Sequence, residues 1–191
     1  MQTQENKPVL MKCEVLTCGP YRFIGKSVYA RTGISGKIFG CLWENSDWIF
    51  EIIDGLQEYA VEDTHNAALC TFNKYDKKTE LIGYTFGRFM RADTPVPNGM
   101  DFFDIPECRI AKGFLRGKFD GRFDVDADFD NASAMIKKEI TQQGIILKPS
   151  AKIFAAEIYP TLPDSDGFSV FGKYIAYELN KPGTEIKSNR T

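Results

Sequence analysis

The chain has 191 residues, and its 24 basic and 26 acidic side chains give it a net charge of −2. A slightly acidic chain lacks the excess positive charge that binds nucleic-acid phosphates, so we expect no direct nucleic-acid partner. The one histidine, His65, excludes a metal site built from several histidines of this chain, and any histidine-based nucleophilic mechanism would depend on it.

Export, membrane insertion and metal binding are not expected. No run of residues approaches the roughly 18–20 apolar residues that a membrane-spanning helix needs, and residues 1–7 are polar. The five cysteines are odd in number and include no C-x-x-C pair, which argues against a disulfide framework and a zinc site. The acidic run from Asp124 lacks the glycine and glutamate of a calcium-binding EF-hand loop. We therefore expect a cytoplasmic protein with no cofactor, no metal and no membrane partner.

The first half of the chain is predicted to form two strands, a helix and two further strands. Turn residues, Cys18-Gly19-Pro20, separate the first two strands, and apolar residues three and four positions apart indicate the helix. Ser35 fits the N-cap of this helix, and Gly55 lies near its end. In chain order, the predicted elements are strands over 9–17 and 21–31, a helix over 37–56, and strands over 67–75 and 79–90.

The second half is predicted to repeat this plan after a connector. Residues 92–101 contain two prolines and an Asn-Gly pair, which are typical of a connecting segment. The predicted elements that follow are a strand over 107–117, a helix over 130–143, and strands over 152–159 and 168–179.

A short echo between the halves indicates an internal duplication. The sequence Phe86-Gly87-Arg88-Phe89 is matched by Phe171-Gly172-Lys173-Tyr174 in the last predicted strand of each half. We therefore predict one α+β domain over residues 1–191, in which duplicated β-α-β-β units are related by a pseudo-twofold axis and form an antiparallel sheet with one helix per repeat. The repeats would span about 9–91 and 102–180, with a disordered tail over 181–191 and a cleft between the repeats.

Several segments resemble one bacterial family in their order and spacing. VPNGM and the following DIPECRIAKG are similar to the mid-chain signature of the GyrI-like domains, also called the bacterial transcription-activator effector-binding family. GPYRFIGKSVYARTG and LIGYTFG are similar to strands of that family's first repeat, and AAEIYP is similar to its E-x-Y strand. The resemblance covers about residues 12–179. The matching signature residues are Val96, Pro97, Gly99, Met100, Ile105, Pro106, Ile110 and Ala111.

The resemblance implies a duplicated fold with a pocket between its halves. Members of the family bind hydrophobic, often cationic, small molecules, either as effector modules of AraC-type or MerR-type regulators or as stand-alone drug-binding proteins and gyrase modulators. Only about ten residues precede the first predicted strand, so we expect a stand-alone member. Two features depart from the family pattern, namely Ala176 where a proline is usual and a longer approach to the second helix over 119–130.

Glu157 is the first candidate site residue. It interrupts an otherwise apolar predicted strand, and an unpaired carboxylate in such a strand costs several kcal/mol when buried, so a partner is expected. Tyr159 shares its face of the strand because side chains alternate with a period of two. A carboxylate beside an aromatic ring suits an organic cation, to which each ring face adds about 0.5–2 kcal/mol.

Aromatic residues make up 13% of the chain, and most are expected to pack in the core. Tyrosine and tryptophan are better candidates for a binding site than phenylalanine because each has a polar tip. Besides Glu157 and Tyr159, the predicted ligand-binding residues are Trp43, Tyr84, Phe86 and Tyr174.

Three functions are compatible with these residues. The first is the binding of a hydrophobic, cationic or aromatic small molecule between the repeats. The second is hydrolysis of a strained electrophile, with Glu157 as general base, because a carboxylate in an apolar cleft can acquire a pKa suited to proton transfer. The third is a protein-interaction role, such as modulation of gyrase, which keeps a protein partner open.

Overall fold

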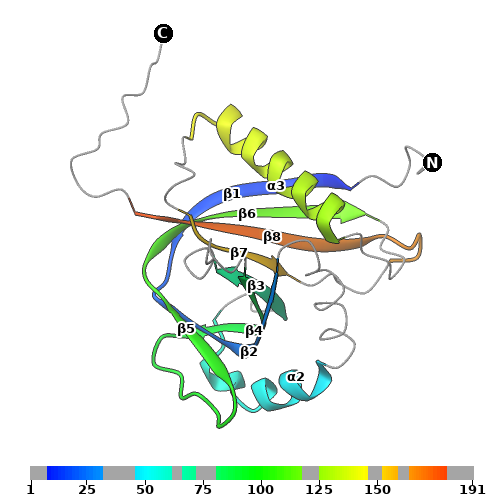
Figure 1. Ribbon diagram of the computed structural model, residues 1–191. Coiled ribbons are helices and arrows are strands. Elements are labelled where there is room, and N and C mark those ends of the chain that lie inside the picture. Colours follow the sequence, from blue (N-terminus) through cyan, green and yellow to red (C-terminus); the bar gives the residue numbers. More distant parts are fainter. Residues whose placement is uncertain are drawn as a thin grey trace.

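The computed structural model describes residues 8–31, 46–61, 66–71, 81–117, 125–145, 152–158 and 164–179, which form an eight-stranded antiparallel sheet and two α-helices (Figure 1). A short 3₁₀ turn spans Gln57–Tyr59. The helices are α2 (Asp47–Asp54) and α3 (Val125–Gln142). The strands are β1 (Val9–Cys18), β2 (Tyr21–Arg31), β3 (Ala67–Thr71), β4 (Leu81–Arg91), β5 (Asp101–Ile105), β6 (Cys108–Gly117), β7 (Lys152–Ile158) and β8 (Ser169–Glu178).

The order of the strands confirms the predicted α+β class. The sheet runs β1-β6-β8-β7-β3-β4-β2-β5. If β1 to β4 are matched with β5 to β8 in turn, this order is the same when it is read from either edge. The centre of the sheet is the antiparallel pair β3 and β7, one strand from each half. This symmetry is what a duplicated unit with a pseudo-twofold axis between β3 and β7 requires.

The element boundaries differ from the predictions at a few places. Strand β5 was not predicted, because Asp101–Ile105 is short and directly follows the proline-rich connector. Helix α3 begins at Val125, five residues earlier than predicted. Ser46, at the N-cap position, makes no side-chain cap to α2. The predicted cap Ser35, helical residues 37–45 and strand residues 72–75 lie outside the described residues, as does His65.

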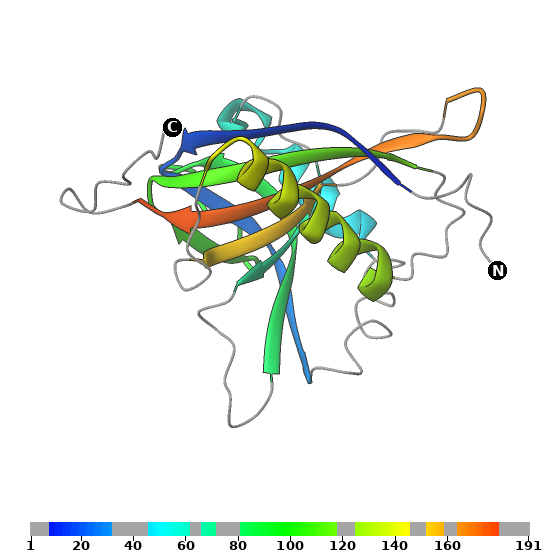
Figure 2. The same cartoon turned by 90° about the horizontal axis from the view of Figure 1, so that it is seen from above.

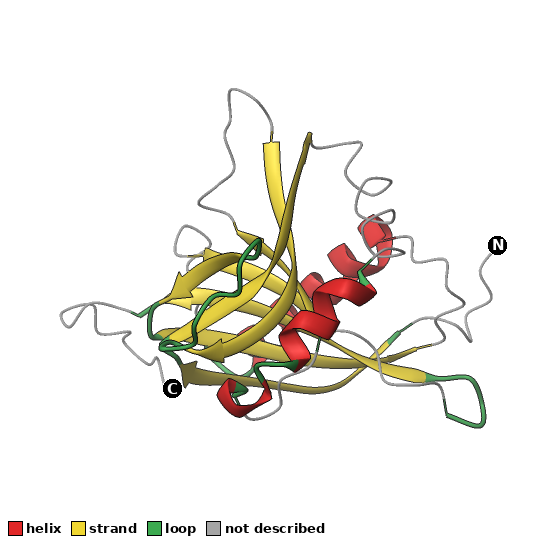
Figure 3. Cartoon of the chain, turned by 90° about the horizontal axis from the view of Figure 1, so that it is seen from below, coloured by secondary structure: helices red, strands yellow, loops and turns green. Residues whose placement is uncertain are grey.

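The two edges of the sheet are joined by a continuous two-stranded ribbon. Strand β1 pairs with β6 up to Cys18 opposite Cys108, and after a turn β2 continues along β5 from Tyr21 opposite Ile105. The sheet therefore curls around one face, and Figure 3 shows this curvature. The enclosed face carries a core to which seven strands contribute, with Phe23, Phe89, Ile110, Phe154 and Tyr174 among its buried members.

The opposite face of the sheet carries both helices. Helix α2 packs on β2 and β4, and α3 packs on β1, β6 and β8 (Figures 1 and 2). Close packing of α3 depends on Gly113, because a Cβ at that position would lie 2.3 Å from Cγ1 of Ile136. The central strands β3 and β7 lie between the strands that the two helices cover. None of the described helices is both long and apolar enough to cross a membrane.

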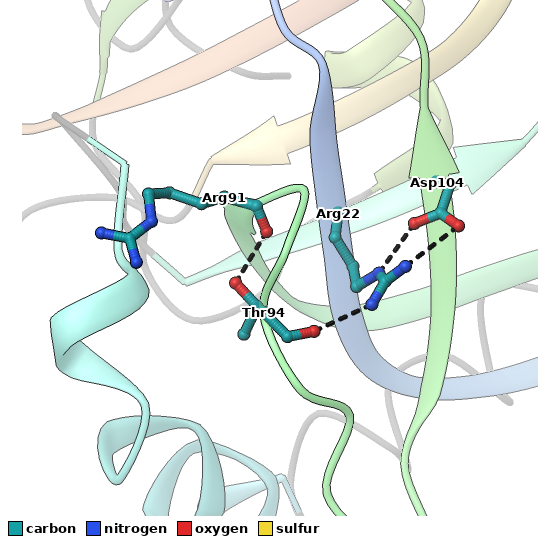
Figure 4. Close-up of polar contacts among 4 residues, drawn as sticks. All are labelled: Arg22, Arg91, Thr94 and Asp104. Carbon is teal, nitrogen blue, oxygen red and sulfur yellow. Dashed lines mark hydrogen bonds and ion pairs between the residues drawn. The ribbon is translucent and has the colours of Figure 1, made fainter.

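The connector between the halves is tied to β2 and β5. The Arg22 guanidinium donates to both carboxylate oxygens of Asp104, at 2.7 and 3.2 Å, and to the Thr94 carbonyl oxygen at 2.9 Å (Figure 4). Thr94 is fully buried, and its hydroxyl donates to the carbonyl oxygen of Arg91 at 2.7 Å. These bonds hold β5 beside β2 and so help to close the ribbon.

Candidate functional site

The centre of the helix-bearing face carries two charged side chains, those of Glu157 and Lys173. Ala68 of β3 lies opposite Phe86 of β4 on one side and opposite Glu157 of β7 on the other. Glu157 in turn lies opposite Lys173 of β8. Directly opposed residues of antiparallel strands share a face, so these four side chains form one row across four strands. Glu157 therefore lies beside the pseudo-twofold axis, between the strands covered by α2 and those covered by α3.

Glu157 is bound by residues from both halves of the chain. The Lys173 ammonium donates to its Oε1 at 2.8 Å, and the Tyr84 hydroxyl donates to its Oε2. The Glu157 side chain is 14% exposed and that of Lys173 only 8%. Hydrogen bonds to an ionised partner are stronger than neutral ones, and a buried carboxylate needs such partners. The partner that the sequence required for Glu157 is thus supplied by one residue of each repeat.

Tyr84 is positioned by the packing of α2. Its ring contacts that of Phe86 edge to face, with 5.4 Å between the ring centroids. Both rings belong to a buried cluster with Ile49, Phe50 and Ile53 of α2. Alternation along β4 places Tyr84 and Phe86 on one face, and α2 covers that face. The hydroxyl is consequently aimed from the first half towards the carboxylate of the second.

Small side chains lie next to Glu157. Cys70 is opposite Tyr84 on β4 and Ala155 on β7, so the neighbours of Glu157 on the two central strands include the small residues Ala68, Cys70 and Ala155. Burial raises the pKa of the Cys70 thiol to about 11, and the negative charge of Glu157 adds to this effect while Lys173 opposes it. The thiol is therefore neutral at physiological pH, and the ionised groups at the centre are Glu157 and Lys173.

The raised pKa of Cys70 predicts a loss of stability at alkaline pH. Between about pH 9 and 11 the unfolded thiol loses its proton while the folded thiol keeps it, so stability falls as pH rises through this window. The full effect is about 3 kcal/mol. Urea denaturation at pH 8.5, 9.5 and 10.5 should show a smaller fall in Cys70→Ala than in the unmodified protein, and equal falls would contradict the assignment.

The position in the first half that matches Lys173 also carries a basic residue with polar partners. Arg88, which matches Lys173 in the duplicated sequence, donates to the Asn66 side-chain oxygen and to Asp54 of α2, both at 2.6 Å. Each half thus directs one basic side chain to a polar partner on this face. In the first half the partners of Arg88 include Asp54 of α2, so the contact anchors that helix. In the second half the partner of Lys173 is Glu157.

The structure brings together three of the predicted site residues, Glu157, Tyr84 and Phe86. Tyr174 lies on the enclosed face instead, where it is 6% exposed and its ring centroid is 6.0 Å from that of Phe114. Its grouping with Glu157 is therefore corrected, because its neighbour Lys173 is the residue of β8 that faces Glu157. Trp43 and Tyr159 lie outside the described residues.

Lys173 was not among the predicted site residues. Two features of the sequence could have identified it. Lys173, like Glu157, is a charged residue within an apolar predicted strand, and it occupies the position that matches Arg88 in the repeated sequence.

Comparison with solved structures shows the fold. SAV2435, in a structure bound to tetraphenylphosphonium, superposes with a TM-score of 0.60 at 10% identity over 88% of this chain and 94% of that chain. A candidate bacterial transcription regulation protein from Staphylococcus aureus MU50 gives a TM-score of 0.56 at 11% identity over 88% and 99%. The chain has a GyrI-like fold. Neither a protein-family model nor a curated sequence matches it.

Proposed function

We propose that this GyrI-like chain binds a lipophilic small molecule, cationic or aromatic, between its two halves on the helix-bearing face. The observation that carries the proposal is the position of Glu157, a nearly buried charged residue at the symmetry axis with partners from both halves. Buried charge is costly and is rare where only packing is needed, whereas a few convergent polar groups in apolar surroundings are typical of ligand sites.

The fold comparison supports the same proposal. SAV2435 is similar in fold over most of both chains, and its structure holds tetraphenylphosphonium, a lipophilic cation. In our proposal Glu157 and Lys173 supply the polar contacts, Tyr84 lines the first-half side, and the ligand lies against the small residues Cys70 and Ala155 of the central strands. Trp43 and Tyr159 remain proposed lining residues from the sequence.

The contacts of Glu157 favour a binding role over hydrolysis. A general base must reach the proton that it removes, and both carboxylate oxygens of Glu157 already accept hydrogen bonds from Tyr84 and Lys173. We therefore place binding first and keep hydrolysis as the function that turnover of a ligand would reveal.

A thermal-shift screen tests the proposal. A panel of lipophilic cations and neutral aromatic compounds should contain ligands that raise the melting temperature, because binding to the folded state alone stabilises it. Glu157→Gln should abolish the shift, measured against the melting temperature of the ligand-free variant. The matched control is Glu51→Gln, which changes an exposed carboxylate on α2 and should keep the shift. A shift that persists in Glu157→Gln would contradict the role of Glu157.

A further inference from the structure

We propose that the site takes an uncharged aromatic molecule with a strongly dipolar hydrogen-bonding group, in preference to a lipophilic cation, because Lys173 already neutralises Glu157. This inference rests on the proposed function and narrows its ligand. It concerns the charge of the site, which the fold alone does not determine.

The ion pair of Glu157 and Lys173 itself carries no net charge that a ligand would have to balance. The Lys173 ammonium lies 2.8 Å from the Glu157 carboxylate, and both side chains are largely removed from water. A cation placed against the carboxylate would also be a few ångströms from the ammonium. Its attraction to one charge and repulsion from the other would nearly cancel, and both interactions are strong where water is excluded. The cost of removing the cation from water would then remain uncompensated.

Within the part of the chain that the structure describes, the neighbouring groups do not restore a negative charge. The Tyr84 hydroxyl donates to Glu157, and the thiol of Cys70 is neutral at physiological pH. Arg88, the basic residue at the equivalent step of the first half, is itself paired with Asp54. The described charges at the centre of this face are therefore balanced in pairs.

A dipolar group suits this balanced pair better than an ion does. Its negative end can accept from the ammonium, while its positive end lies towards the carboxylate. The aromatic body of such a ligand would lie against the small residues Cys70 and Ala155, beside the ring of Tyr84. A phosphine oxide, an N-oxide or an aromatic amide has this combination of an apolar body and a compact dipole.

Calorimetric titration with three probes of similar shape tests the inference. The probes are the cation tetraphenylphosphonium, the anion tetraphenylborate and the neutral triphenylphosphine oxide. With the unmodified protein, the neutral probe should bind about tenfold or more tightly than either ion, the ratio that a modest uncompensated charge interaction produces. A smaller ratio, or tighter binding of an ion, would overturn the inference while leaving the proposed function intact. Failure of all three probes to bind would overturn both.

Removal of the lysine gives a second, independent outcome. Lys173→Met leaves Glu157 as an unneutralised carboxylate, so binding of tetraphenylphosphonium should strengthen about tenfold or more relative to the unmodified protein. Lys173→Gln, which keeps a hydrogen-bond donor, should have the same effect and serves if the methionine variant does not fold. Unchanged or weaker binding of the cation in a folded variant would overturn the inference. Lys12→Met, which removes an exposed lysine on β1, is the control and should change no affinity.

Discussion

Glu157→Leu is expected to lower the free energy of unfolding by about 3–5 kcal/mol, because it leaves the Lys173 ammonium buried without its carboxylate. The loss arises mainly from the loss of the buried ion pair, since leucine is an acceptable residue in an otherwise apolar strand. Urea denaturation at neutral pH measures it. The effect of a single surface carboxylate would be far smaller.

The double variant Glu157→Leu/Lys173→Met separates the charge effect from packing. Replacement of both partners of a buried ion pair by apolar residues is often nearly neutral, so the double variant should be more stable than Glu157→Leu alone. Lys12→Met breaks a second ion pair, Lys12 with Glu14, which has the same 2.8 Å separation but leaves the lysine 62% exposed. That control should lose less than about 1 kcal/mol. Equal losses in Lys12→Met and Glu157→Leu would contradict this account.

Gly87→Ala is the second substitution with a large expected effect, a loss of about 3 kcal/mol or more. Gly25 and Gly87 lie directly opposite each other in β2 and β4. A Cβ on Gly87 would lie 1.9 Å from the carbonyl oxygen of Ile24, and one on Gly25 would lie 1.9 Å from that of Phe86. These obstacles are backbone atoms, which cannot turn aside as a flexible side chain can.

Gly55→Ala is the matched control for this prediction. Gly55 ends α2 with ordinary helical backbone angles, is exposed, and would bring its Cβ no closer than 3.2 Å to a carbonyl oxygen. Urea denaturation should show a change below about 0.5 kcal/mol in this variant. A Gly87→Ala protein as stable as Gly55→Ala would show that the close approach of β2 and β4 is not required.

The duplication could be predicted because local sequence patterns repeat in the two halves. Alternating and helical spacings recur in the same order in both halves, and the Phe-Gly-basic-aromatic echo marks one step of the repeat at Arg88 and Lys173. The pairing of β1 with β6 and of β5 with β2 could not be predicted. It depends on contacts between residues 76 to 107 positions apart, from Gly25 opposite Asp101 to Val9 opposite Arg116, which no local pattern encodes.

The candidate site was predictable only in part for a similar reason. The cost of burying Glu157 showed that a partner was needed, and alternation placed Tyr84 with Phe86. Alternation alone does not reveal which face of β8 meets which face of β7. Both Lys173 and Tyr174 were therefore compatible with the site, and the register of Glu157 against Lys173 was needed to choose between them.

The crossed pairing of the first strands makes each half incomplete. Strand β1 extends the sheet of the second half beyond β6, and β5 extends that of the first half beyond β2. The halves thus exchange the edge strands β1 and β5 in the manner of a domain-swapped dimer, except that one chain supplies both strands. Breaking the connector between β4 and β5 would not by itself release the halves, since each would still hold a strand of the other. The crossed pairing of β1 with β6 and of β5 with β2 therefore keeps β3 beside β7, and it holds the residues around Glu157 together.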